Sequence, residues 1–156
     1  MSVFKAGKRT GIHWENLNSA KEIIERLSLD IKSYDERKFE DRISGALQPN
    51  FKKFIDQRNI KQVMTRVTLF GHDHRPDMSI DKDGVAIEVK TAKTGSSFRE
   101  AIGQSMIYRL GYRFVIVLWV DSTKDKMYKN LCNDPDSNES LFIKEMEDYN
   151  IFCIIK

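Results

Sequence analysis

The sequence has few cysteines and no long hydrophobic run. Its 156 residues include only two cysteines, Cys132 and Cys153, and neither belongs to a Cys-x-x-Cys or Cys/His cluster. A disulfide scaffold and a structural zinc site are therefore not expected. The longest apolar run, Phe114 to Val120, is far shorter than the roughly 20 residues of a membrane-spanning helix, and the first residues contain no apolar signal core. We expect a cytoplasmic protein with no membrane association.

The length and the hydrophobic content of 40% predict a single domain over residues 1–156. The net charge is only +3, but basic residues are concentrated in two places, which suits a polyanion such as nucleic acid. The same clusters are equally typical of ordinary solvated surfaces. The clustered cations are Lys5, Lys8 and Arg9 in an irregular arm over residues 1–16, and Lys52, Lys53, Arg58, Lys61 and Arg66 further along.

Hydrophobic periodicity predicts an α/β protein with a central mixed sheet of four to five strands. Apolar residues at helical spacing predict helices over 18–31 and 34–47, where Pro49 ends the second. A capping box, Ser97 to Glu100, opens a third helix that runs to about 112. The expected strands are 63–70, 77–80, 85–90, 114–120 and 151–155, with an acidic loop around 133–136 and a last helix over 140–149.

The strands 77–80 and 85–90 form a predicted hairpin around the turn residues 81–84. Alternation places Ile87 and its apolar neighbours on one face of the second strand, and Glu88 and Lys90 on the other. If the turn is short, Ile80 pairs with Val85, and Asp77 falls opposite Glu88. A slip of two residues keeps these faces, whereas a slip of one buries the charges.

The two negative charges of an Asp77–Glu88 pair across two strands need a compensating positive charge. Two carboxylates about 5 Å apart repel by roughly 3 kcal/mol at an effective dielectric near 20. A divalent cation supplies it, because Mg²⁺ is typically held by one or two carboxylates together with substrate phosphate. Lys90 lies one strand step beyond, where it can orient an attacking water and offset negative charge. The competing interpretation is a surface charge ladder on a hairpin.

These residues resemble the Pro-Asp and (Asp/Glu)-x-Lys signature of the PD-(D/E)XK nuclease superfamily, in Pro76-Asp77 and Glu88-Val89-Lys90. The resemblance implies a restriction-endonuclease-like, three-layer α/β/α fold. We expect a prokaryotic, viral or phage origin. The resemblance further implies Mg²⁺, replaceable by Mn²⁺, held by Asp77, Glu88 and the Val89 carbonyl.

Related nucleases also carry a glutamate on the helix before the sheet. Glu40 is the choice here, and Glu36, one turn earlier, is the alternative. Gln104 and Tyr108 resemble the Gln-x-x-x-Tyr motif of RecB-like nucleases. Four residues apart, they share one side of a helix and can face the site.

The resulting hypothesis is a Mg²⁺-dependent nuclease that hydrolyses phosphodiester bonds of DNA. Arg75 and the clustered cations Lys5, Lys8, Arg9, Lys52 and Lys53 would contact the nucleic acid. His72-Asp73-His74 is an additional metal or phosphate contact or simply a polar strand end. A small domain of this kind would need a homodimer to cut both strands at once. The alternatives are a catalytically silent nucleic-acid-binding or assembly module, and a nuclease that acts on RNA.

Overall fold

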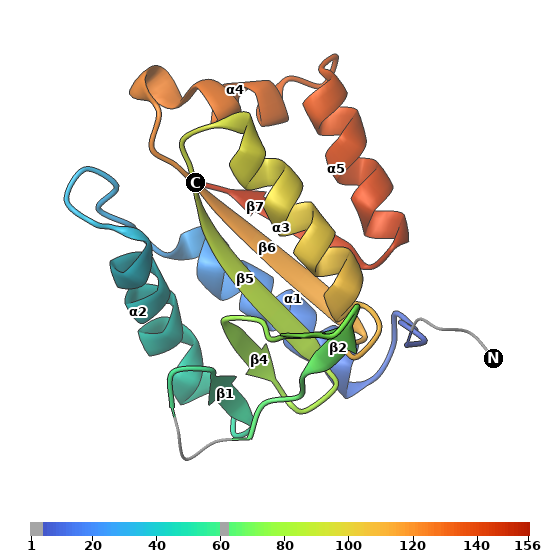
Figure 1. Cartoon of the computed structure of the whole chain (residues 1–156). Coiled ribbons are helices and arrows are strands. Elements are labelled where there is room, and N and C mark those ends of the chain that lie inside the picture. Colours follow the sequence, from blue (N-terminus) through green and yellow to red (C-terminus); the bar gives the residue numbers. More distant parts are fainter. Residues whose placement is uncertain (1–4, 60–62) are drawn as a thin grey trace.

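The protein is built around a mixed five-stranded sheet (Figure 1). The computed structural model describes residues 5–59 and 63–156. The strands, in spatial order, are β1 (Phe54–Asp56), β4 (Met78–Ile80), β5 (Val85–Ala92), β6 (Phe114–Asp121) and β7 (Ile151–Ile155). β1, β4 and β5 are antiparallel neighbours, whereas β5, β6 and β7 run parallel. The predicted α/β class and mixed sheet are confirmed.

Helices cover both faces of this sheet. α1 (Ile12–Arg26) and α2 (Glu36–Leu47) pack on one face, and α3 (Gly95–Tyr108), α4 (Met127–Asn133) and α5 (Asn138–Asp148) lie over the other. Two 3₁₀ turns, η1 (Gln48–Asn50) and η2 (Lys124–Lys126), complete the helical segments. A separate hairpin consists of β2 (Val67–Leu69) and β3 (His72–His74). No helix in the described part of the chain has the length and apolarity to cross a membrane.

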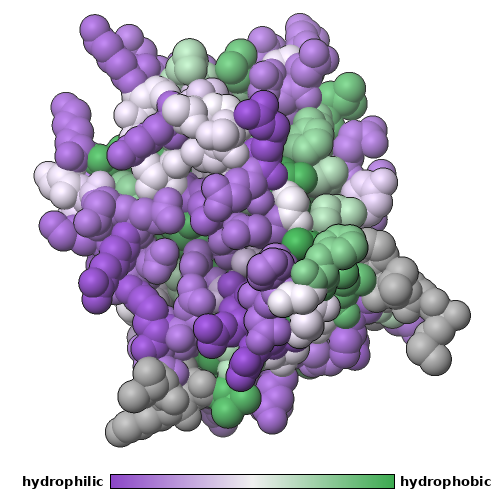
Figure 2. Space-filling model, in the orientation of Figure 1, coloured by the Kyte–Doolittle hydropathy of each residue, from purple (hydrophilic) through white to green (hydrophobic). Residues whose placement is uncertain are grey.

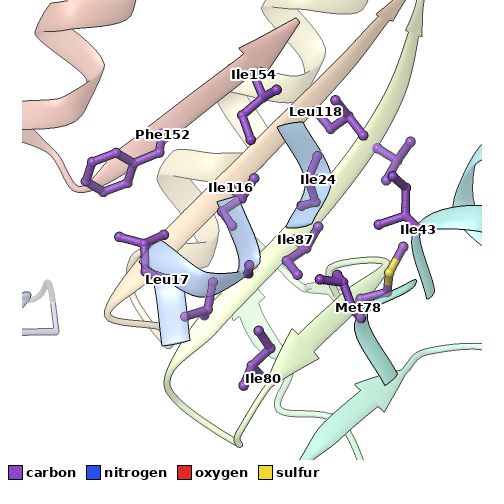
Figure 3. Close-up of a cluster of buried hydrophobic side chains, with 14 of the residues drawn as sticks. Leu17, Ile24, Ile43, Met78, Ile80, Ile87, Ile116, Leu118, Phe152 and Ile154 are labelled. Atoms are coloured by element: carbon purple, nitrogen blue, oxygen red, sulfur yellow. The ribbon is translucent and has the colours of Figure 1, made fainter. Parts of the chain in front are cut away.

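Alternation along β5 divides the interior into two cores. Ile87 and its odd-numbered neighbours join the apolar side chains of α1 and α2, among them Leu17, Ile24 and Ile43 (Figure 3). Ala86 belongs to the other core, beneath α3 and α5. Glu88 projects to this second side as well, because it lies two residues from Ala86. The face of β5 that carries the charged residues is therefore covered by α3.

Several predicted boundaries were wrong. The first helix begins at Ile12 and ends at Arg26, so residues 12–16 are helical and do not belong to an irregular arm. The Trp14 ring lies 5.6 Å from Phe114 and 6.0 Å from Phe152 between ring centroids, so packing extends the helix toward the N-terminus. The Ser97 capping box does not form, because α3 begins two residues earlier, at Gly95.

The strand prediction for 63–70 was also only partly right. Within it only Val67–Leu69 is a strand, and it pairs with the unpredicted β3 outside the main sheet. β1 was not predicted, because a three-residue strand presents too few positions for alternation to be visible. α4 was not predicted, and it ends at Asn133, where the expected acidic loop over 133–136 begins. The strand over 151–155 has the predicted bounds.

Candidate active site

The register of the β4–β5 hairpin is the predicted one. Ile80 pairs with Val85, and Met78 pairs with Ile87. Asp77 immediately precedes β4 and therefore lies next to Glu88 at the end of the ladder. Beyond Ile87, β5 continues to Ala92 with no described strand on its β4 side, although β6 still pairs along its other side.

Two carboxylates occupy this open edge of β5. The Val89 N–H donates to Asp77 Oδ2 at 2.8 Å, and the Thr91 N–H donates to Glu36 Oε2 at 2.8 Å. These amides, two residues apart, are the ones that a longer β4 would have bonded. A strand residue presents its N–H and its C=O to the same edge. The Val89 carbonyl therefore also faces this edge, next to the two carboxylates.

Asp77 is held firmly in place. Its Oδ1 accepts a hydrogen bond from Gln57 Nε2 at 3.0 Å, and its own carbonyl accepts one from the Gln57 N–H at 3.0 Å. Burial raises the pKa of Asp77, and the nearby Glu36 adds to this, although the bond from Val89 and the charge of Lys90 act in the opposite direction. The carboxylate is thus well oriented but incompletely compensated in charge.

Glu88 is the most perturbed acid of the site. It is only 3% exposed. The Tyr108 hydroxyl lies 3.1 Å from Glu88 Oε2 and 3.1 Å from the Arg75 carbonyl oxygen, and its proton is shared between these two acceptors. Burial and the charge of Asp77 raise the pKa of Glu88 to about 8, against the opposing effects of Lys90 and Tyr108. The predicted contact between Tyr108 and the site is therefore present.

Lys90 supplies the positive charge on the same face. Its Nζ lies 3.5 Å from Glu88 Oε1 and 3.5 Å from Glu100 Oε1. Burial alone would lower the pKa of Lys90, but the surrounding carboxylates, led by Glu88, raise it. The ammonium group is therefore charged and half-buried beside the most perturbed acid.

Both helix glutamates considered for the site lie near it, in different ways. Glu36 bonds the edge of β5 directly through Thr91. Glu40 Oε2 lies 3.9 Å from Arg58 Nε, and burial together with the charge of Asp77 raises the pKa of Glu40 to about 7. Glu36 is thus the one in direct contact with the strand, and Glu40 stands behind it, one turn along α2.

Gln104 lies one helical turn before Tyr108 on α3. Its Oε1 is buried and has no hydrogen-bond partner among the residues that the structure describes. A buried amide oxygen without a partner is uncommon in a folded protein and can accept a bond from a ligand or a water.

Of the predicted nucleic-acid contacts, Arg75 lies next to these acids through its backbone, whereas Lys5, Arg9 and Lys53 have other partners. Lys5 Nζ lies 3.4 Å from Asp83 Oδ2 and Lys53 Nζ lies 3.3 Å from Asp81 Oδ2, both at the turn end of the hairpin, away from Asp77. Arg9 donates to the Glu147 carbonyl at 2.7 Å. Lys8, Lys52 and Arg75 are exposed, and Lys61 lies outside the described residues.

The sequence His72-Asp73-His74 forms strand β3, and these residues do not belong to a metal cluster in the described part of the chain. His72 and Asp73 are exposed, and Asp73 accepts bonds from Arg66 Nη1 at 3.1 Å and from Thr68 Oγ1 at 2.6 Å. Within residues 5–59 and 63–156, no three His, Cys, Asp or Glu side chains converge closely enough to form a ready-made metal cluster.

The oxygen donors nevertheless fit a hard cation. Asp77, Glu36 and the Val89 carbonyl face one edge, and Glu88 lies beside Asp77. Carboxylate and carbonyl oxygens with substrate phosphate are the donors that Mg²⁺ and Mn²⁺ take. Each bonded carboxylate oxygen retains a further lone pair. In the orientation of Figure 1, much of the molecular surface is hydrophilic (Figure 2).

Sequence reasoning missed Gln57 and the direct contact of Glu36. Gln57 follows a strand too short to recognise, and only the structure shows that its side chain and backbone both bond Asp77. Glu36 had a weak signal, since it lies on the same helix face as Glu40. Comparison of the chain with protein-family models, curated proteins and solved structures gave no match.

Proposed function

We propose that this protein is a Mg²⁺-dependent nuclease that hydrolyses phosphodiester bonds of DNA, with a restriction-endonuclease-like arrangement of its sheet. One observation carries the proposal: two close acids from adjacent antiparallel strands, Asp77 and Glu88, share a site with Lys90. Mn²⁺ is expected to substitute for Mg²⁺, because it takes the same oxygen donors.

The position of each residue in the site indicates its role in the proposed reaction. Asp77 and Glu88, with the Val89 carbonyl, would hold the cation, and Glu36 or Glu40 would complete the shell directly or through water. The cation would neutralise charge on the phosphate in the transition state. Lys90 would orient the attacking water and stabilise the developing negative charge. Tyr108 fixes the rotamer of Glu88 through its hydrogen bond.

Electrostatics supports a cation at this position. Burial raises the pKa values of Asp77 and Glu88, and their mutual repulsion raises that of Glu88 further. Ionising both acids costs free energy. Among the described ion pairs, Lys90 is the only positively charged side chain in contact with either acid, so one positive charge faces two negative ones. A divalent ion removes this cost, and the fold then retains two acids that would otherwise destabilise it.

A second candidate is a nucleic-acid-binding or assembly module without turnover. The lack of a three-residue metal cluster among the described residues favours it, as do the contacts that Tyr108 and Lys90 already make with Glu88. Calorimetry with Mg²⁺ separates the two candidates. A nuclease binds the ion at the acids, so Asp77→Asn weakens binding, whereas a binding module has no need of the ion.

The direct test is cleavage of end-labelled single-stranded DNA, duplex DNA, branched DNA and RNA in Mg²⁺ and in chelator. The proposal expects hydrolysis of at least one DNA substrate that requires Mg²⁺ and disappears in Glu88→Gln. Cleavage of RNA alone would change the substrate class. Activity that persists in chelator or in the variant would contradict the proposal.

A further inference from the structure

The β2–β3 hairpin presents an aromatic side chain to solvent. Phe70 lies in the two-residue turn between Leu69 and His72, and it is 92% exposed. It is the most exposed of the large hydrophobic side chains in the described part of the chain. An exposed phenylalanine gains none of the burial that normally stabilises an aromatic residue.

The backbone at this turn is unfavourable for phenylalanine. Phe70 has a φ of 51° and Gly71 a φ of 78°. Positive φ at both central residues of a two-residue loop is the requirement of a type I′ turn, for which Asn-Gly is preferred. A bulky residue at positive φ is an outlier. Neither burial nor turn geometry explains why Phe occupies the first position, which is grounds for a functional hypothesis.

The hairpin is braced, so its tip is held in a defined place. Thr68 Oγ1 donates to Asp73 Oδ1 at 2.6 Å across the two strands, and Arg66 forms an ion pair with Asp73. At its base, Val67 packs so closely on Gly111 that a Cβ there would lie 2.8 Å from Val67 Cγ2. β2 lies beside the C-terminal end of α3 (Figure 1).

The tip is also within reach of the acids. β3 ends at His74, and Asp77 follows three residues later. Asp77 is seven residues after Phe70, so their Cα atoms lie at most about 25 Å apart. That is roughly seven base-pair steps of duplex at about 3.4 Å each. A nucleic acid with a phosphate at the acids that runs toward the hairpin therefore reaches its tip within about seven nucleotides.

We propose that Phe70 is a stacking platform for an unpaired nucleobase of the substrate, a role that rests on the proposed nuclease function. Stacking of one base on an aromatic side chain strengthens binding roughly fivefold to 150-fold. Separating a stacked duplex step weakens it by a comparable factor. One phenylalanine therefore gains little from an intact duplex and gains most from single-stranded or branched DNA, whose base is already unstacked.

The first variant separates this role from a structural one. Phe70→Asn places the preferred residue in the turn, so the melting temperature stays the same or rises. Affinity for single-stranded DNA, measured by fluorescence anisotropy in a Glu88→Gln background that prevents cleavage, falls at least about fivefold. Affinity for blunt duplex changes less. Leu141→Asn, which removes a 57% exposed apolar side chain on α5, is the matched control and leaves both affinities unchanged.

The second variant reports contact without relying on cleavage. Phe70→Trp in the Glu88→Gln background places an indole at the exposed tip, while Trp119 is buried and Trp14 is half-buried. Quenching of the added fluorescence by oligo-dT, with affinity restored relative to Phe70→Asn, supports stacking. DNA that binds without quenching, or with equal affinity to Phe70→Asn, overturns the role of Phe70 alone. A protein that binds no DNA overturns this inference and the nuclease proposal together.

Discussion

Two buried acids on neighbouring parallel strands, Glu88 on β5 and Asp121 on β6, have opposite electrostatic character. Both are nearly inaccessible, with exposures of 3% and 0%. Asp121 accepts from the Thr123 N–H at 2.9 Å and from the Lys129 N–H at 2.8 Å. Burial would raise the pKa of Asp121, but the hydrogen bond from the Thr123 hydroxyl, together with these two backbone bonds, outweighs it and lowers the pKa. Glu88 has a pKa raised to about 8.

The difference teaches how a structural carboxylate differs from a functional one in this fold. Asp121 receives fixed backbone donors at both oxygens and secures the connection between β6 and α4. Glu88 has a shared hydroxyl proton and a lysine at 3.5 Å, and it faces a second acid. Burial is common to both, so it is the supply of donors that separates them. An acid left undercompensated by its own fold is the better candidate to bind a cation.

The largest expected effect is on cleavage. Glu88→Gln and Asp77→Asn should each lower turnover roughly 10³-fold or more, since each removes a charged donor from the cation site. Asp121→Asn should leave turnover of the folded fraction nearly unchanged. Single-turnover cleavage of labelled DNA measures all three. Equal losses in all three variants would erase the distinction between the acids.

Lys90→Ala should lower turnover roughly 10²- to 10³-fold while leaving Mg²⁺ affinity nearly intact, because it removes transition-state stabilisation and not a ligand. Glu100→Gln is the matched control: it removes the other carboxylate that contacts Lys90 but is 61% exposed. Its effect should remain within a few-fold. Calorimetry and cleavage rates together check the prediction, and full activity of Lys90→Ala would refute the assigned role.

The two acids should also differ in their effect on stability. Asp121→Asn should lower the free energy of unfolding by about 1–3 kcal/mol, because an amide group cannot accept at both positions and leaves a buried N–H unpaired. Glu88→Gln should leave the metal-free protein equally stable or more stable, because the amide keeps the shape and removes the charge. Urea denaturation in chelator measures both. Destabilisation of similar size in the two variants would contradict the comparison.

The pH dependence should run in opposite directions for the two acids. The folded-state pKa of Glu88, about 8, lies above its ordinary value of 4.5. Its contribution to stability is therefore fully present below about pH 4.5 and is lost as pH rises through 8. Glu40, raised to about 7, acts in the same direction. The pKa of Asp121 is lowered, so its contribution to stability is present above the ordinary pKa of an aspartate. This contribution is lost as the pH falls through the lowered pKa.

Denaturation of the metal-free protein between pH 5 and pH 9 checks this prediction. The free energy of unfolding should fall as the pH rises across this range. Glu88→Gln should make this fall less steep, and the remaining fall should be the contribution of Glu40. A flat profile, or a slope untouched by Glu88→Gln, would show that Glu88 is adequately compensated without metal.

The hairpin and its register were predictable because both strands alternate strictly around a short turn, so Asp77, Glu88 and Lys90 could be placed correctly. The family resemblance implied that Tyr108 belongs to the site, and helical spacing placed it on the same side of the helix as Gln104; the structure shows its bond to Glu88. The bond between Glu36 and Thr91 could not be predicted, because it depends on where β4 stops and leaves the β5 edge open. Gln57 was equally hidden, since its place depends on the three-residue β1. Tertiary context, which periodicity does not encode, fixes both.

The central claim is that Asp77 and Glu88 form a cation site whose charge the fold leaves uncompensated, and thermal melting at pH 8 with increasing Mg²⁺ tests it most directly. Wild type should melt lower than Glu88→Gln in chelator. Its melting temperature should then rise with Mg²⁺, by about 5–10 °C when the ion reaches roughly 100 times its Kd. Glu88→Gln should respond little. A wild-type melting temperature that ignores millimolar Mg²⁺, or a rise that persists undiminished in Glu88→Gln, would contradict the account.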